Sequence, residues 1–237
     1  MLEARNLRKT YHNGAMPLDV LKGLDLQIAP QGFLAVTGPS GAGKSTLLHL
    51  LAGLDVPTEG EVLWEGRSLS SLSDLERARF RNRTIGVVFQ FYHLLPELST
   101  LENVMLPGLV NGQARRRALR ERALEVLSQV GLKDRAAHKP SQLSGGELQR
   151  AAIARALINQ PTMMLCDEPT GNLDSNTGQH VVEVLIGLHR RQGMGVVLVT
   201  HEHELAQLAD RWIELRDGRM VSDTRRQTSD IRPQTTP

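Results

Sequence analysis

The sequence has one cysteine, no long apolar run and no apolar leader, and each absence excludes a class of protein. Cys166 lies in the apolar run 163–166, so no disulfide can form within one chain, and a small buried residue in a reducing cytoplasm is the expected role. No apolar segment approaches the roughly 20 residues that span a bilayer. Residues 1–11 lack the apolar stretch of a signal peptide. We therefore expect a soluble chain that reaches a membrane only through a partner.

Charge of one sign is also scarce. The formal net charge is +2 over 237 residues, which is too small to indicate nucleic acid as a partner, because that inference needs a concentrated basic face. With 40% hydrophobic and 23% charged residues, the composition is typical of one or two globular domains with a substantial core.

A glycine-rich segment between an apolar run and a helical pattern predicts a phosphate-binding loop. Residues 38–45 read GPSGAGKS, after the β-type run 33–37 and before the helix-forming run 46–52. Glycines allow a tight turn that aims backbone N–H groups at phosphate oxygens, and the helix N-terminus adds partial positive charge. Lys44 supplies a full charge, and Ser45 offers a hydroxyl to Mg²⁺. The predicted nucleotide-binding residues of this loop are Gly38, Pro39, Ser40, Gly41, Ala42, Gly43, Lys44, Ser45 and Thr46.

Two adjacent carboxylates follow a second apolar run. Asp167 and Glu168 come directly after the predicted strand 162–166, and a nucleotide site of a parallel sheet lies at such strand ends. Alone, the pair would fit a solvated strand cap equally well. Together with the phosphate loop, it predicts Asp167 as a Mg²⁺ ligand and Glu168 as the general base that polarises the attacking water.

Alternating strand and helix patterns predict an α/β fold with a mostly parallel sheet covered by helices. The expected strands are 2–7, 19–28, 33–37, 61–64, 85–89, 162–166, 195–199, 212–215 and 220–221, and the expected helices are 72–81, 146–159, 175–191 and 202–209, with a helical region at 101–131. Apolar residues at helical spacing in that region are Leu119, Ala123, Val126, Leu127 and Val130. The polar segment 224–237 is expected to be a disordered tail.

Residues 143–150 read LSGGELQR, and with the motifs above they resemble the nucleotide-binding domain of ABC transporters from residue 2 to about 222. The resemblance implies a P-loop NTPase of the ABC type, with an antiparallel β edge on a mostly parallel sheet and an inserted helical subdomain. It also implies a RecA-like core at 1–90 and 146–223, a helical subdomain at 91–145 that contains the signature, and a tail at 224–237. ATP and Mg²⁺ are the implied cofactors.

The same resemblance assigns roles to residues that indicate little singly. Tyr11 matches an aromatic residue that stacks on adenine, although a lone Tyr more often packs in a core. Gln90 matches a glutamine that reaches Mg²⁺ and the attacking water, and His201 matches a histidine that contacts the γ-phosphate. The remaining implied contacts, to ATP held by Lys44 of a second copy, come from Ser144, Gly145, Gly146 and Asp174. A homodimer with ATP between its subunits is therefore expected.

Within this family, residues 90–96 and 101–104 are similar to ATPase subunits of lipoprotein-releasing complexes, and more loosely to those of MacB-type efflux and FtsE-type cell division. The Phe91-Tyr92 pair and Leu148 depart from the pattern, where Phe-His and an Arg or Gln are commoner. The implied function is to power lipoprotein release at the cytoplasmic face of the inner membrane, with force transmission to cell-wall hydrolases and efflux as alternatives. Two LolC/LolE-like integral membrane subunits are the implied partners.

Two surface segments have two interpretations each. The apolar, aromatic stretch from Gln90 to Pro96 predicts a docking site for the membrane subunits, or it packs the helical insert onto the core. Five arginines between residues 115 and 122 fit a solvated helix face better than a contact with anionic lipid headgroups. They are Arg115, Arg116, Arg117, Arg120 and Arg122.

Overall fold

A six-stranded sheet forms the centre of the molecule, whose computed structural model describes residues 1–14, 16–110 and 116–226. Its strands, in spatial order, are β10 (Arg219–Arg225), β9 (Arg211–Arg216), β3 (Phe33–Thr37), β8 (Gly195–Val199), β7 (Met163–Asp167) and β6 (Ile85–Val88). All neighbouring pairs are parallel except β9 and β10. The expected mostly parallel sheet is confirmed.

A second, antiparallel sheet provides the expected β edge. Its spatial order is β2 (Met16–Ile28), β1 (Leu2–Asn13), β4 (Glu59–Trp64) and β5 (Arg67–Ser68). Strands β1 and β2 continue past the predicted bounds because they pair with each other along their whole length, from Leu2 opposite Ile28 to Asn13 opposite Met16.

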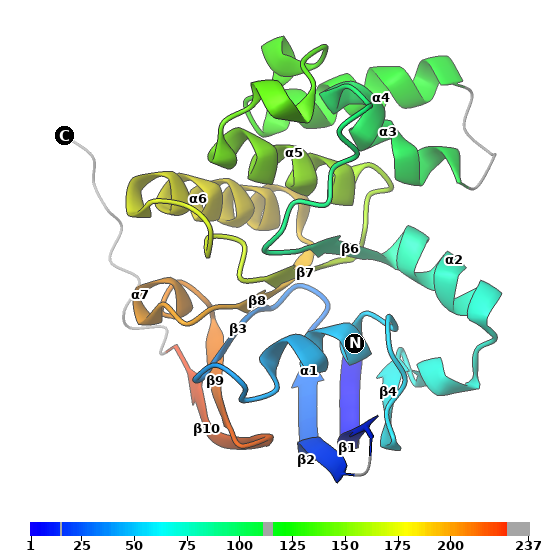
Figure 1. Cartoon of the computed structure of the whole chain (residues 1–237), viewed down its shortest axis with the longest axis vertical. Helices are drawn as coiled ribbons and strands as arrows, with labels where there is room; N and C mark the ends of the chain where they lie inside the picture. Colours follow the sequence, from blue (N-terminus) through cyan, green and yellow to red (C-terminus); the bar gives the residue numbers. More distant parts are fainter. Residues whose placement is uncertain (15, 111–115, 227–237) are drawn as a thin grey trace.

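Helices cover the two faces of the central sheet (Figure 1). They are α1 (Lys44–Leu51), α2 (Asp74–Thr84), α3 (Thr100–Leu109), α4 (Arg116–Gln129), α5 (Gly145–Leu157), α6 (Ser175–Gln192) and α7 (His203–Ala206), with single 3₁₀ turns at Leu69–Ser71, Lys133–Arg135 and Pro140–Gln142. Helices α5 and α6 lie over one face, α3 and α4 lie beyond them, and α1 lies between the other face and the β1–β2–β4 sheet.

The buried strands divide their side chains between two hydrophobic cores. In β3, Phe33 and Ala35 face the core formed with α3 to α6, whereas Leu34 and Val36 face the core formed with α1 and the antiparallel sheet. Successive side chains of a strand point to opposite faces, so a strand covered on both sides is apolar throughout. This explains why β3 and β8 read as continuous apolar runs and are buried at every position.

The helical insert has the predicted apolar stripe. Leu119, Ala123, Val126, Leu127 and Val130 are all buried in the core that α5 shares. The insert is built of two helices in its described part, and residues 111–115, including Arg115, lie outside the described residues.

Other predicted bounds were also wrong. The helix expected over 202–209 is the four-residue α7, because the chain tightens into i→i−3 bonds from Leu208 to Leu205 and from Ala209 to Ala206 before it enters β9. The expected tail at 224–237 begins too early, because β10 pairs with β9 as far as Arg225. Residues 227–237 lie outside the described residues. The helix expected over 146–159 spans Gly145–Leu157.

Cys166 lies in β7, where its side chain belongs to the core formed with α3 to α6, and it is fully buried. Burial, together with the neighbouring Asp167 carboxylate, raises the pKa of its thiol to about 12. The predicted role as a small buried hydrophobic residue is consistent with this environment.

Candidate active site

The phosphate loop between β3 and α1 needs glycine at the positions where its backbone passes other chain segments closely. At Gly38, with φ of 139°, a Cβ atom would lie 2.1 Å from the carbonyl oxygen of Leu215. At Gly43, with φ of 99°, it would lie 2.8 Å from a methyl group of Leu21. Both φ values are ones that other residues rarely adopt. The loop can therefore pass this close to β2 and β9 only because Gly38 and Gly43 have no side chain.

Lys44 places its charge at the centre of this loop. The side chain is only 6% exposed, and its Nζ donates hydrogen bonds to the carbonyl oxygens of Gly38 (2.8 Å) and Pro39 (3.0 Å). The same Nζ lies 3.8 Å from Oε1 of Glu168. The cation thus lies between the N-terminal turn of α1 and the carboxylate at the end of β7.

Ser45 and Asp167 form the second polar contact of the site. The Ser45 hydroxyl donates to Oδ1 of Asp167 at 3.0 Å, which joins α1 to the end of β7. Burial raises the pKa of Asp167, and the Ser45 hydrogen bond opposes this shift only in part. Among the residues that the structure describes, no group of three or more His, Cys, Asp and Glu side chains could hold a metal ion.

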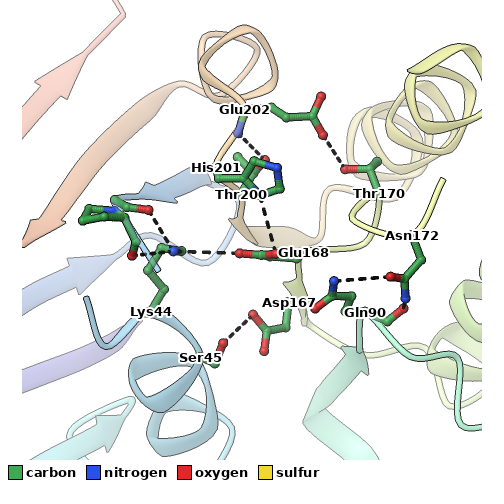
Figure 2. A network of polar contacts seen from close by, with 12 residues as sticks. Lys44, Ser45, Gln90, Asp167, Glu168, Thr170, Asn172, Thr200, His201 and Glu202 are labelled. Atoms are coloured by element: carbon green, nitrogen blue, oxygen red, sulfur yellow. Dashed lines mark hydrogen bonds and ion pairs between the residues drawn. The ribbon is translucent and has the colours of Figure 1, made fainter. Parts of the chain in front are cut away.

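Glu168 is held in an unusual backbone conformation directly beside His201. Its φ is 43°, in the left-handed region, while its amide donates to the Val199 carbonyl at 3.0 Å. One carboxylate oxygen faces Lys44, and the other lies 3.5 Å from Nδ1 of His201 (Figure 2). A non-glycine residue at positive φ is strained, and such strain is concentrated at functional sites.

Gln90, at the end of β6, is joined to the loop that follows β7. Its Nε2 donates to Oδ1 of Asn172 at 3.5 Å, and Nδ2 of Asn172 donates to the Gln90 carbonyl at 3.1 Å. Figure 2 shows Gln90 on the Asp167 side of the site, with its amide turned toward Asn172. The structure therefore brings Lys44, Ser45, Asp167, Glu168 and His201 into one network and places Gln90 at its border.

The signature residues lie at the start of another helix and contact other partners. Ser144 is the N-cap of α5 and accepts a hydrogen bond from the Glu147 amide at 3.3 Å. Around Gly145, the nearest side chains are those of Leu173 and Tyr92, and around Gly146 it is Thr177. These neighbours do not belong to the phosphate loop. Within one chain, the contacts of the signature are thus separate from the Lys44–Glu168 network.

Glu147 stabilises the N-terminus of α5. We predict that Glu147→Ala lowers the free energy of unfolding by about 1–2 kcal/mol at pH 7. Its carboxylate accepts from the Ser144 amide (2.8 Å) and from Nε of Arg135 (2.9 Å), and these contacts lower its pKa from 4.5 to about 2. A lowered pKa gives stability that is complete above pH 4.5 and is lost as the pH falls toward 2. Urea denaturation at pH 7, 5 and 3 measures the difference.

The matched control is Glu121→Ala, which removes an exposed carboxylate paired with Arg117 on α4. Exposed pairs contribute about 0–1 kcal/mol, so this variant should stay close to the native chain at every pH. A Glu147→Ala difference that stayed constant from pH 7 to pH 3 would exclude the charged carboxylate as its cause.

Two further predicted site residues, Tyr11 and Asp174, have hydrogen-bond partners outside the Lys44–Glu168 network. The Tyr11 hydroxyl donates to Oδ2 of Asp55 at 2.9 Å, and the ring is 37% exposed. Asp174 is the N-cap of α6, where its carboxylate accepts from the Thr177 amide at 3.0 Å. The Thr177 side chain and then that amide lower the pKa of Asp174.

Sequence reasoning missed a contact between the loops that follow β7 and β8. Thr170, after Glu168, donates from its hydroxyl to Oε1 of Glu202 at 2.8 Å, and the Glu202 amide donates to the Thr200 hydroxyl at 3.0 Å (Figure 2). The position of Glu202 directly after His201 was the one signal available. This contact ties the loops after β7 and β8 together on both sides of His201.

A cavity of about 740 Å³ lies between the base of the β1–β2 hairpin and β9–β10, and none of its lining residues belongs to the network above. Four of its charged side chains form two pairs, Arg5 with Glu3 and Arg211 with Asp223, and Asp210 accepts a hydrogen bond from the Phe33 amide.

Comparison with known proteins identifies the family to which this constellation belongs. A family model described as "ABC transporter" matches residues 21–171, which include the phosphate loop, the signature and Glu168. The chain belongs to the ABC transporter family. It is an ATP-binding domain with the α/β fold of a P-loop NTPase. As an enzyme, it is an ABC-type ATPase.

Curated relatives match this ABC domain over nearly their whole lengths. A "Lipoprotein-releasing system ATP-binding protein LolD" of Syntrophus aciditrophicus (strain SB) is 51% identical over 222 residues, covering 94% of this chain and 99% of the relative. A protein of the same name from Xanthomonas campestris pv. campestris (strain 8004) is 54% identical over 220 residues, covering 93% and 92%.

Solved structures match the ABC fold closely. A dimeric ATP-binding cassette in a post-hydrolysis state, bound to ADP and Pi, is 42% identical with a TM-score of 0.88 and covers 95% of this chain and 98% of its own. The cbiO1 protein from Clostridium perfringens, described as part of an ABC transporter complex, is 26% identical with a TM-score of 0.84, covering 94% and 88%.

Proposed function

We propose that this chain is the ATP-hydrolysing subunit of a membrane complex that releases lipoproteins, and that Lys44, Glu168 and His201 form its reaction centre. The observation that supports it most is the position of Glu168. Its carboxylate lies between the Lys44 cation, at 3.8 Å, and the His201 ring, at 3.5 Å. A base there faces the phosphate that the loop 38–46 cradles.

Each residue of the centre has a defined part in the reaction. Lys44 and the backbone amides of the loop bind the β- and γ-phosphates of ATP and offset the charge that develops on them. Glu168 accepts a proton from water as the water oxygen bonds to the γ-phosphorus and the bond to the ADP oxygen breaks. His201 hydrogen-bonds the γ-phosphate. The products are ADP and phosphate.

The site also fits Mg²⁺. The Ser45 hydroxyl and the Asp167 carboxylate, 3.0 Å apart, are hard oxygen donors beside the phosphate loop, and Gln90 is the third proposed ligand. A cation there offsets the burial that raises the pKa of Asp167. Held by these residues, Mg²⁺ would supply positive charge that neutralises the phosphates of ATP.

Two copies of the chain complete two sites. Ser144, Gly145 and Gly146 lie at a helix N-terminus, which suits an anionic phosphate, yet in one chain their contacts are separate from Lys44. We propose that they bind the ATP held by a second copy, together with Asp174. The dimeric state of a cassette 42% identical to this chain supports the arrangement.

Lipoprotein release is supported by relatives with that printed function, which are 51% and 54% identical over more than nine-tenths of this chain. In the described part of the chain, no helix is long and apolar enough to cross a membrane. We therefore propose that two integral membrane subunits dock near Gln90–Pro96, on the cytoplasmic face of the inner membrane.

The proposed docking segment has exposed apolar residues on a fixed backbone. Phe91 is 66% exposed and Leu95 is 47% exposed. Side chains of two helices hold the backbone of this segment. Arg155 of α5 donates to the Tyr92 carbonyl at 2.9 Å, and Asn103 of α3 donates to the Leu95 carbonyl at 3.0 Å. We propose a helical subdomain at 91–145, between core segments at 1–90 and 146–223, that presents this surface.

The test is an affinity purification from detergent-solubilised native membranes with a tagged Glu168→Gln chain, ATP and Mg²⁺. We expect two different multi-span membrane proteins and acylated lipoproteins to co-purify, as identified by mass spectrometry. A Phe91→Asp chain in the same background is the matched control and should lose them while still forming the ATP-bound dimer.

One small membrane partner together with division proteins would instead support force transmission to cell-wall hydrolases. Recovery of a soluble dimer alone, in native membranes that contain the complex, would contradict the membrane assignment. Neither result would alter the family to which the chain belongs.

A further inference from the structure

The turn after α1 holds the side chain of Tyr11 through one carboxylate. Oδ2 of Asp55 accepts the Tyr11 hydroxyl at 2.9 Å, and Oδ1 accepts from Nζ of Lys9 at 2.8 Å. Nζ of Lys9 also donates to the Val56 carbonyl at 2.8 Å and lies 4.8 Å from the centre of the Tyr11 ring. Asp55 therefore fixes both the phenol and the cation that covers one face of it.

Burial and charge indicate that this contact is well ordered. The Lys9 side chain is only 12% exposed. Burial alone would raise the pKa of Asp55, but hydrogen bonds from Lys9, the Val56 amide and Tyr11 lower it overall. The pKa of Tyr11 is raised, first by burial and then by its hydrogen bond to Asp55. Near neutral pH, Tyr11 is thus a neutral phenol, and Asp55 and Lys9 form an ion pair.

The same turn connects Tyr11 to the phosphate loop. Asp55 follows α1, which begins at Lys44, and the turn is fastened to that helix by a hydrogen bond from the Leu54 amide to the His49 carbonyl at 2.9 Å. It is fastened to β1 by a hydrogen bond from the Thr10 amide to the Thr58 hydroxyl at 3.0 Å. The position of the ring is therefore set relative to the helix that cradles the phosphates.

We propose that Asp55 and Lys9 are positioning residues that hold the Tyr11 ring as the platform for the adenine base, an inference that rests on the proposed binding of ATP at this site. The Lys9 cation occupies one face of the ring by a cation–π contact. Tyr11 is 37% exposed, and the face opposite Lys9 is the one proposed to receive the base. Leu18, the exposed cross-strand neighbour of Tyr11, adds apolar surface beside it.

Two ligands separate positioning of the base from damage to the phosphate loop. AMP-PNP, a non-hydrolysable ATP analogue, has both base and phosphates, whereas inorganic tripolyphosphate has phosphates alone. The Kd of AMP-PNP is measured by calorimetric titration in the presence of Mg²⁺. We expect this Kd to rise about fivefold in Asp55→Ala, as for the loss of one ordered stacking contact between the base and the Tyr11 ring. The Kd for tripolyphosphate should stay within about twofold.

Other variants make the result specific. Lys9→Met keeps a long side chain without charge, and it should weaken AMP-PNP binding about threefold; Tyr11→Ala sets the upper limit of the effect. Glu59→Ala removes a nearby carboxylate whose partner is Arg8, and both Kd values should stay native. In steady-state ATP hydrolysis, Asp55→Ala should raise KM while kcat changes by less than about twofold.

Equal weakening of both ligands in Asp55→Ala would overturn the proposal, because it would show a general distortion of the loop. So would native AMP-PNP binding in Asp55→Ala when Tyr11→Ala weakens it. Circular dichroism and thermal melting check that each variant is folded, and Lys9→Met tests the proposal separately if Asp55→Ala is not. A native chain that binds neither compound would instead refute the proposed nucleotide site itself.

Discussion

We expect Glu168→Gln to lower the rate of ATP hydrolysis by about 10³-fold, within the 10²–10⁴ range of general-base catalysis, and to leave ATP bound. Glutamine keeps the size of the side chain but cannot accept the proton of the attacking water. It also removes a negative charge that lies 3.8 Å from Nζ of Lys44. Because ATP is anionic, we expect its Kd to be unchanged or lower. Phosphate release in single-turnover experiments and equilibrium ATP binding measure the two effects.

The control for this variant is Glu204→Gln, in the exposed first turn of α7 three residues after His201. It changes the local charge equally and should hydrolyse ATP at the native rate. If Glu168→Gln kept a tenth or more of native activity, another group would have to be the base. If it lost ATP binding as well, the carboxylate would have a structural role at the end of β7.

Gly38→Ala should destabilise the chain by more than about 4 kcal/mol, which corresponds to a fall in Tm of roughly 10 °C for a domain of this size. The added Cβ would lie 2.1 Å from the Leu215 carbonyl oxygen, and the φ of 139° excludes a relaxed alanine. Backbone of β9 cannot move away as a flexible side chain could, since it pairs with β3 and β10. Thermal melting with and without ATP measures the loss.

Gly41→Ala, in the same loop, separates the clash from the strain. Its φ of 79° is also positive, but no atom lies within 4 Å of the added Cβ. We expect a cost of about 1 kcal/mol from the backbone conformation alone. Equal melting temperatures for the two variants would show that the close approach to Leu215 does not limit stability.

The fold could be predicted from the sequence largely because its buried strands are short, apolar and bounded by turn residues. Gly195–Val199 and Phe33–Thr37 have the same bounds in the structure as in the prediction. The length of α7 could not be predicted, since Leu205, Ala206 and Ala209 are buried in either a helix or a 3₁₀ turn. Local pattern does not distinguish these two when the same side chains face the core.

The contacts of the candidate site depend on pairs that are far apart in the chain. The motifs predicted Ser45 and Asp167 as Mg²⁺ ligands, but not the direct hydrogen bond between them, which joins residues 122 positions apart. The Tyr11–Asp55 pair joins residues 44 positions apart. The spacing of apolar residues predicts which face of an element is buried, but it does not predict which polar group a side chain contacts. The contacts of Asp55, Thr170 and Glu202 therefore could not be predicted in the same way.

The environment of Cys166 makes the chain a convenient carrier for chemical probes. Its thiol is fully buried in β7 with a pKa of about 12, so it should resist maleimide while the sheet is intact. A cysteine introduced at Phe91 would be the single reactive thiol and could report, by fluorescence, when a partner covers that surface. In the unmodified chain, the rate at which Cys166 is labelled would measure how often the central sheet opens, and therefore the rate of global unfolding.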